Sequence, residues 1–194
     1  MTAHTVSFVT GNDAKLAAAR EALRGFDVRA VGVELDEIQS VDVREVAEHK
    51  ARQAHRVLGG PVIVEDSGFS IDELGGFPGA LAKPLLASAG ARGVVALADL
   101  TRSRAARFTS VLVYIGPDGA SRTFCDEGRP GTVSPVPIGA ETPGVWAQLW
   151  RVFIPSGEHT TLAALDERER VRLLEGWRRE SVFTLLGEWL AAVN

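Results

Sequence analysis

About a third of the way along the chain lies the segment Val62-Ile63-Val64-Glu65-Asp66-Ser67-Gly68-Phe69, in which an apolar run leads into two adjacent acids and a glycine. The apolar run predicts a short buried strand that ends at the acidic pair. Two neighbouring carboxylates repel each other unless a positive group lies beside them, and Mg²⁺ commonly binds one or two carboxylates together with phosphate oxygens. The segment therefore indicates a metal site or, as the structural alternative, a solvated turn at a strand end.

Strand and helix patterns alternate around this segment. Residues 6–9 are β-like, Asn12 can cap a helix that begins near Asp13, and residues 28–33 form a second β-like run. Residues 43–58 repeat apolar side chains with the helical period before two glycines end the pattern. This order predicts an α/β fold with some parallel strand pairing.

The second half of the chain continues with short elements, and we expect residues 1–194 to form a single domain. The predicted elements are a helix over 85–100, hairpin strands over 108–115 and 121–125, a turn at 129–131, a loop over 135–143, a strand over 145–154, and helices over 166–174 and about 178–193.

Composition excludes several classes of function. The formal net charge is −4 and no basic run or arginine-rich arm is present, so we expect no nucleic-acid partner. No apolar stretch approaches the roughly 20 residues of a membrane span, and the chain start does not resemble a signal peptide. Cys125 is the single cysteine, which fits a reducing compartment. We therefore expect a soluble cytoplasmic protein without a membrane partner.

Thr10-Gly11-Asn12-Asp13-Ala14-Lys15 joins a predicted strand to a helix start. Gly11 allows the backbone to approach a ligand, the helix start directs unpaired N–H groups at it, and Lys15 lies about one turn further on. These features suit a phosphate, although the spacing is not that of a P-loop. An ordinary capped turn is the alternative.

Three further charged residues are candidates. Glu37 lies in an acidic loop, where a lone carboxylate is most often solvent-exposed. Lys50 interrupts an apolar helical stripe and is either a phosphate contact or a lysine with a buried stem. Lys83 follows the glycine-rich turn over residues 74–79. No nucleophile elbow or histidine pattern indicates a serine hydrolase.

Three stretches together resemble the inosine triphosphatase family of nucleoside-triphosphate pyrophosphatases. The first runs from Phe8 to Asn12 with Lys15, and the second combines residues 35–39 with the helix that follows. The third joins residues 64–68 to the turn over 74–79 and to Lys83. The resemblance covers residues 6–132 most densely, and all three stretches occur in the family's order.

The resemblance implies a fold and a reaction. The family fold is an elongated mixed sheet flanked by helices in two lobes with a central nucleotide cleft, usually as a homodimer. The reaction is Mg²⁺-dependent hydrolysis of a nucleoside triphosphate to a monophosphate and pyrophosphate. The catalytic residues implied are Glu65 and Asp66, and the Mg²⁺ ligands are Glu37, Glu65 and Asp66. The implied substrate-binding residues are Thr10, Gly11, Asn12, Lys15, Lys50, Ser67, Lys83, Trp146 and Arg178.

The last third departs from the family pattern. Ala147 occupies the position of an aspartate that the pattern uses to recognise the purine, and Arg178 stands where a Ser-His-Arg motif is expected. Trp146 could stack on a base or belong to the core. We therefore expect altered base specificity for a non-standard purine such as ITP, XTP or dITP. A nucleotide-binding protein without turnover and a pathway-specific nucleotide phosphohydrolase remain alternatives.

Overall fold

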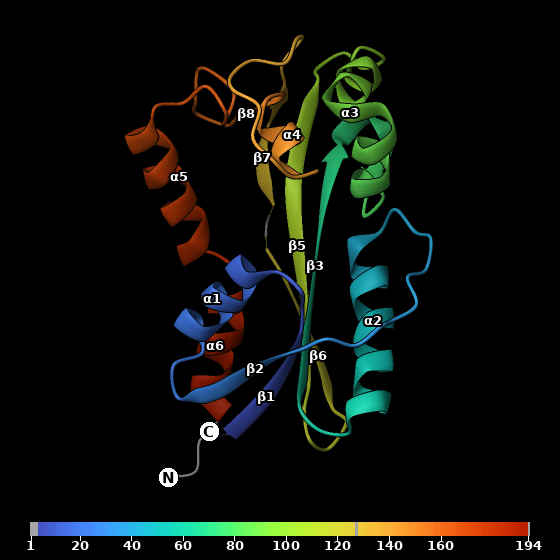
Figure 1. The fold of residues 1–194 in the computed structure, drawn as a ribbon, viewed down its shortest axis with the longest axis vertical. Coiled ribbons are helices and arrows are strands. Elements are labelled where there is room, and N and C mark those ends of the chain that lie inside the picture. Colours follow the sequence, from blue (N-terminus) through green and yellow to red (C-terminus); the bar gives the residue numbers. More distant parts are fainter. Residues whose placement is uncertain (1–3, 127, 194) are drawn as a thin grey trace.

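An eight-stranded mixed sheet extends along the length of the molecule (Figure 1). The structure is a computed structural model that describes residues 4–126 and 128–193, so the chain start used to argue against a signal peptide lies mostly outside it. The strands are β1 (His4–Val9), β2 (Phe26–Val31), β3 (Val62–Ile71), β4 (Pro78–Gly79), β5 (Ala105–Ile115), β6 (Ser121–Cys125), β7 (Arg129–Val133) and β8 (Phe153–Pro155).

The sheet combines parallel and antiparallel pairs. Its order is β2-β1-β3-β5-β7-β8, with β4 paired to β3 and β6 paired to β5. Strand β1 is parallel to β2 and β3, and the remaining pairs are antiparallel. The α/β class and the mixed sheet flanked by helices are confirmed.

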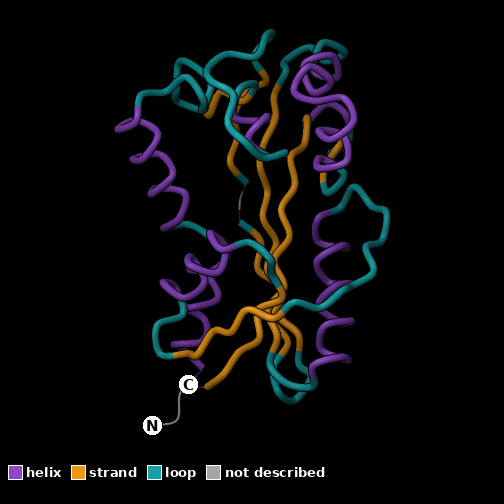
Figure 2. The backbone as a smooth tube through the Cα atoms, in the orientation of Figure 1, coloured by secondary structure: helices purple, strands orange, loops and turns teal. Residues whose placement is uncertain are grey.

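Helices cover both faces of the sheet (Figure 2). They are α1 (Asp13–Ala22), α2 (Val43–Leu58), α3 (Ala82–Ala98), α4 (Ala147–Trp150), α5 (Glu167–Arg179) and α6 (Val182–Val193), with a 3₁₀ turn η1 (Asp72–Leu74). Figure 1 shows α1, α5 and α6 on one side and α2 and α3 on the other. One apolar cluster joins α1 and α6 to Ile63 of β3, and another joins α2 to Val62 and Val64.

Strand β3 is longer than the sequence suggested. It pairs with β5 at every residue from Val62 to Ile71, so Glu65 and Asp66 lie in mid-strand. The expected strand end at the acidic pair is wrong, because cross-strand pairing carries the strand through Gly68. Adjacent strand residues face opposite sides of a sheet. Glu65 therefore shares the α1 face with Ile63, and Asp66 shares the α2 face with Val64.

One edge of β3 has a gap in its pairing. Strand β1 pairs with β3 only at Val62 and Ile63, and β4 pairs with it only at Phe69 and Ser70. Between these two contacts, the part of the chain that is described supplies no strand partner on that edge. The acidic pair lies in this gap.

Several other predicted elements differ in the structure. Residues 145–154 contain the short helix α4 and the first two residues of β8 instead of one strand, and the predicted turn at 129–131 is the start of β7. Helix α3 begins at Ala82 and is kinked at Gly90, where the Gln148 side chain accepts from the freed N–H of Ala91. These segments are determined by contacts with distant elements, which local patterns do not encode.

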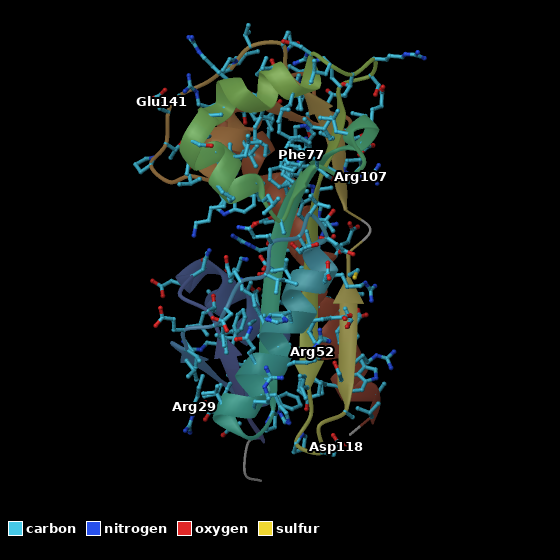
Figure 3. The ribbon with its side chains drawn as sticks, turned by 90° about the vertical axis from the view of Figure 1, so that its right-hand side faces the viewer. Arg29, Arg52, Phe77, Arg107, Asp118 and Glu141 are labelled. Atoms are coloured by element: carbon cyan, nitrogen blue, oxygen red, sulfur yellow. The ribbon has the colours of Figure 1, made fainter. Side chains whose placement is uncertain are left out.

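The two long strands connect the two ends of the molecule. Figure 3 shows Arg29, Arg52 and Asp118 on the lower part and Phe77, Arg107 and Glu141 on the upper part, with β3 and β5 passing through both. A separate core cluster fills the upper part and includes Phe69, Phe153 and Leu149. Within the described ranges, no helix has the length and hydrophobicity needed to cross a membrane.

Candidate active site

Lys15 of α1 contacts two side chains in the middle of β3. Its Nζ lies 2.5 Å from Glu65 Oε2 and donates to Ser67 Oγ at 3.2 Å. Ser67 Oγ donates to Glu65 Oε1 at 2.6 Å, whereas the contact at Oε2 is an ion pair without hydrogen-bond geometry. The Glu65 side chain is only 3% exposed and that of Lys15 is 31% exposed. We call these three residues the Lys15 cluster.

The loop between β1 and α1 forms a capped helix start. Asn12 Oδ1 accepts from the backbone N–H groups of Ala14 and Lys15 at 3.0 and 3.2 Å, which confirms the predicted cap. Thr10 Oγ1 accepts from the Asn12 N–H at 3.1 Å. A Cβ added at Gly11 would meet no heavy atom within 4 Å. The loop therefore has open space beside it, next to the positive end of α1 and the Lys15 ammonium.

Lys50 of α2 forms a second cluster on the other face of β3. Its Nζ donates to Asp66 Oδ2 at 3.1 Å and forms a close ion pair with Glu37 Oε1, from the loop before α2. Asp66 Oδ1 accepts from the Ser67 N–H at 2.9 Å, which fixes the orientation of the carboxylate. The Lys50 side chain is 18% exposed and that of Glu37 is 70% exposed. We call Glu37, Lys50 and Asp66 the Lys50 cluster.

The charged groups of the Lys50 cluster shift one another's pKa values toward the ionised forms. The hydrogen bond from Lys50 lowers the pKa of Glu37, and the charge of Lys83 acts in the same direction. Burial alone would lower the pKa of Lys50, but hydrogen bonds and charges from Glu37 and Asp66 outweigh it, so the pKa is raised. Lys50 is therefore an ammonium and Glu37 a carboxylate at neutral pH.

The predicted convergence of Glu37, Glu65 and Asp66 around one ion does not occur. No group of three or more acidic, histidine or cysteine side chains with metal-binding geometry exists in residues 4–126 and 128–193. The reason is the strand geometry, because Glu65 and Asp66 face opposite sides of β3. The structure brings Glu37 and Asp66 together and leaves Glu65 with Lys15.

Glu37 and Asp66 nevertheless suit a magnesium ion. Both carboxylates contact the same Lys50 ammonium, so they lie close enough to each other to share one cation. Mg²⁺ needs only one or two protein carboxylates when water and phosphate oxygens complete its shell. The donor set of the Lys50 cluster therefore fits the ion that the resemblance implies. Lys83, at the start of α3, is exposed and acts on Glu37 only through its charge.

Comparison with known proteins identifies the family. The model of the Ham1 family matches residues 6–175, which include both clusters. The chain belongs to the Ham1 family. A dITP/XTP pyrophosphatase of Methanopyrus kandleri is 36% identical over 186 residues, or 95% of each chain. Inosine triphosphate pyrophosphatase 2 of Trypanosoma cruzi is 35% identical over 173 residues, covering 88% of this chain and 85% of that protein. The resemblance drawn from the three sequence stretches is confirmed.

Solved structures of Ham1 proteins share the fold. A HAM1 protein from Coxiella burnetii superimposes with a TM-score of 0.78, covering 98% of this chain and all of that chain, at 20% identity. A nucleoside-triphosphatase from Mycobacterium abscessus gives a TM-score of 0.74 over 97% of this chain and 98% of that chain, at 21% identity. At this identity the likeness establishes the fold alone.

The segment around Trp146, where the sequence departs from the family pattern, packs against the core. Trp146 and Trp150 are partly buried and pack against the upper core cluster, as the core alternative proposed. Ala147 borders a cavity of about 430 Å³, together with Glu141 and Arg151. A contact between Trp146 and a base stays a prediction.

Arg178 lies near the end of α5, beyond the span that the family model matches. It lines a cavity of about 300 Å³ between α1 and the junction of α5 with α6, together with Arg24 and Arg179. A contact between Arg178 and the substrate stays a prediction.

Two residues, Ser110 beside the Lys15 cluster and Arg129 on β7, had no local signal in the sequence. Ser110 is paired with Ser67 across β3 and β5, with the two Oγ atoms 3.4 Å apart. Arg129 Nη2 donates to the backbone oxygens of Trp177 and Glu180 at 2.9 Å each, which anchors the end of α5 to β7. Only the strand register reveals the first contact, and only the packing of α5 reveals the second.

Proposed function

We propose that this Ham1 chain hydrolyses a nucleoside triphosphate to a nucleoside monophosphate and pyrophosphate, with Mg²⁺ as cofactor. The main support is the arrangement of two lysine–carboxylate clusters on the two faces of β3, at the point where one strand edge lacks a partner. The named activities of the relatives support the same reaction class. The homodimer implied by the resemblance stays a prediction, because the structure contains a single chain.

The phosphate end of the site uses charges from both clusters. Lys15 is held by Glu65 and Ser67 beside the positive end of α1, and Lys50 lies on the opposite face of β3. A polyphosphate that crosses the unpaired edge would meet an ammonium from each side. Positively charged groups fixed in advance lower the barrier for phosphoryl transfer without reorganisation during the reaction.

Asp66 is the residue on which the hydrolytic step depends. The Ser67 N–H holds its Oδ1, and its Oδ2 points toward Lys50. Glu37 and Asp66 would hold Mg²⁺, which when bound supplies charge neutralisation at the phosphates. The Asp66 carboxylate orients the attacking water and accepts its proton, which a carboxylate can do without a histidine.

Base recognition is relaxed in this proposal. Ala147 has no polar group, and the side chain of its neighbour Gln148 is already occupied by the Ala91 N–H and the Leu86 carbonyl oxygen. A site that lacks dedicated hydrogen-bond partners for the base discriminates weakly between purines. Non-standard purine nucleotides would be the preferred substrates, and the standard purine triphosphates would be hydrolysed with kcat/KM values within roughly a hundredfold of theirs.

A substrate panel tests the proposal. Purified protein is incubated with Mg²⁺ and XTP, ITP, dITP, GTP or ATP, and the products are separated by chromatography. We expect monophosphate and pyrophosphate in equal amounts, with kcat/KM values within roughly a hundredfold of one another across the purines. Binding without any product would favour the nucleotide-binding alternative, and release of orthophosphate would assign a different reaction.

A further inference from the structure

The Lys50 ammonium occupies the position between Glu37 and Asp66 that a metal ion would need. Nζ contacts one oxygen of each carboxylate, and these two carboxylates come from separate segments of the chain. Without this ammonium, two like charges would face each other, an arrangement that raises the free energy of the ionised pair. A divalent cation offers the same compensation with more charge.

We propose that Lys50 is an internal cation that keeps this site closed to bare divalent metal and couples metal binding to nucleotide binding. A metal ion that enters alone must displace the ammonium and break its contacts with Glu37 and Asp66. When a metal ion enters together with a nucleotide, the displaced ammonium can donate its hydrogen bonds to a phosphate oxygen instead. Bound nucleotide therefore increases the affinity for the metal ion, and bound metal ion increases the affinity for the nucleotide by the same factor.

The surroundings of Lys50 support this role over that of an ordinary surface ion pair. Its side chain is only 18% exposed, and it projects from α2, a helix whose fully buried residues are all apolar and include Ala47, Ala51 and Ala54. A half-buried ammonium with two carboxylate partners is displaced at a higher cost than an exposed one. The inference rests on the proposed function for the nature of the nucleotide, but its metal-binding part requires no turnover.

The test measures binding of Mn²⁺, which shares the oxygen preference of Mg²⁺ and is counted by electron paramagnetic resonance. Affinity is determined with and without a non-hydrolysable purine triphosphate analogue. In the absence of nucleotide, Lys50→Met is expected to bind Mn²⁺ roughly tenfold more tightly than the wild type. The factor by which the analogue increases Mn²⁺ affinity is expected to be roughly tenfold smaller in Lys50→Met than in the wild type.

Three further variants locate the effect. Arg52→Met removes an exposed cation of α2 that pairs with Glu48 and belongs to neither cluster, and is expected to leave Mn²⁺ affinity within about twofold of the wild type. Lys50→Arg keeps the cation and is expected to keep the weak affinity. Adding Asp66→Asn to Lys50→Met removes the gain if the metal binds between Glu37 and Asp66.

Failure of the inference is separable from failure of the proposed function. Equal Mn²⁺ affinity of the wild type and folded Lys50→Met, without nucleotide, overturns the inference even if pyrophosphate is released. A tighter site in Lys50→Met supports it even if no nucleotide is hydrolysed. Should Lys50→Met fail to fold, Lys50→Gln keeps a polar end without the charge, and the same gain is expected.

Discussion

Glu65 is almost fully buried, and Lys15 is its one cationic partner among the described residues. A buried carboxylate that loses its counter-charge is costly, because burial removes its solvation. We therefore predict that Lys15→Met lowers the free energy of unfolding by about 2–4 kcal/mol, measured by urea denaturation.

The matched experiment combines Lys15→Met with Glu65→Gln. The double variant is expected to recover most of the loss, since Ser67 can still donate to the amide oxygen at position 65. A Lys15→Met protein as stable as the wild type would show that the ion pair contributes nothing to the fold.

Gly11 is expected to act in ligand binding and to have no effect on stability. A Cβ at this position would meet nothing within 4 Å, and Gly11 is absent from the residues with positive φ. Gly11→Ala should therefore change the free energy of unfolding by less than about 0.5 kcal/mol. If phosphate lies against the loop, nucleotide affinity measured by calorimetry should fall roughly tenfold.

Gly176→Ala provides the control for this substitution. Gly176 also has open space around it and no positive φ, and it lies on α5, which supplies no residue to either cluster. The prediction fails if the two alanine variants bind the nucleotide analogue equally well.

At the scale of elements, the Glu73 carboxylate connects η1 to the loop before β5, and we call this set of hydrogen bonds the Glu73 brace. Glu73 accepts from the Ser103 Oγ at 2.6 Å and from the backbone N–H groups of Ser103 and Arg102 at 2.9 and 3.1 Å. The hydrogen bond from Ser103 is the main reason why the pKa of Glu73 is lowered below the ordinary value of 4.5. This brace holds the loop that enters β5, the strand paired with β3.

The lowered pKa makes the brace pH-dependent. Because the pKa of Glu73 is lower in the folded protein than in the unfolded chain, its ionised carboxylate stabilises the fold. This stabilisation is complete at pH values above 4.5, the pKa in the unfolded chain, and is lost as the pH falls through the lower pKa of the folded protein. Glu73→Gln should therefore be less stable than the wild type at about pH 7, and the gap should close on acidification below about pH 4. Thermal unfolding of both proteins across this pH range measures the difference in stability. Glu175→Gln, at an exposed position of α5, serves as the control. A gap that is constant with pH would contradict the prediction.

Close packing of elements also fixes β3. A Cβ at Gly68 would come within 2.4 Å of the Val43 side chain, so α2 packs directly against the strand there. Gly79 of β4 has positive φ, and a Cβ there would lie 1.9 Å from the Val41 carbonyl oxygen. These glycines bring the start of α2 and the glycine-rich turn to the strand that carries both clusters.

Across the whole molecule, sequence patterns predicted the elements that periodicity or a turn defines. Helix α2, strand β6 and the Asn12 cap are confirmed, because each depends on local signals. The course of β3 past Asp66 and the assignment of residues 145–154 to α4 and β8 depended on distant strands and on α3, which a local pattern cannot reveal. Similarly, the types of charged residue in the site could be predicted, but their grouping could not.

The grouping of site residues follows from the strand geometry. Treating Glu65 and Asp66 as the end of a strand allowed both to point at one ion. Once they lie in mid-strand, the alternation of side chains assigns Glu65 to Lys15 and Asp66 to Lys50. The metal hypothesis therefore now rests on Glu37 and Asp66 alone.

The most direct measurement is the rate of pyrophosphate release from XTP by the wild type and by Asp66→Asn, with Asp118→Asn as control. Asp118 lies in the turn between β5 and β6, far along the sheet from both clusters (Figure 3). We predict that Asp66→Asn lowers kcat at least roughly a thousandfold while Asp118→Asn stays within about twofold of the wild type. Comparable rates for the wild type and folded Asp66→Asn would contradict the assignment of the chemistry to this point of β3.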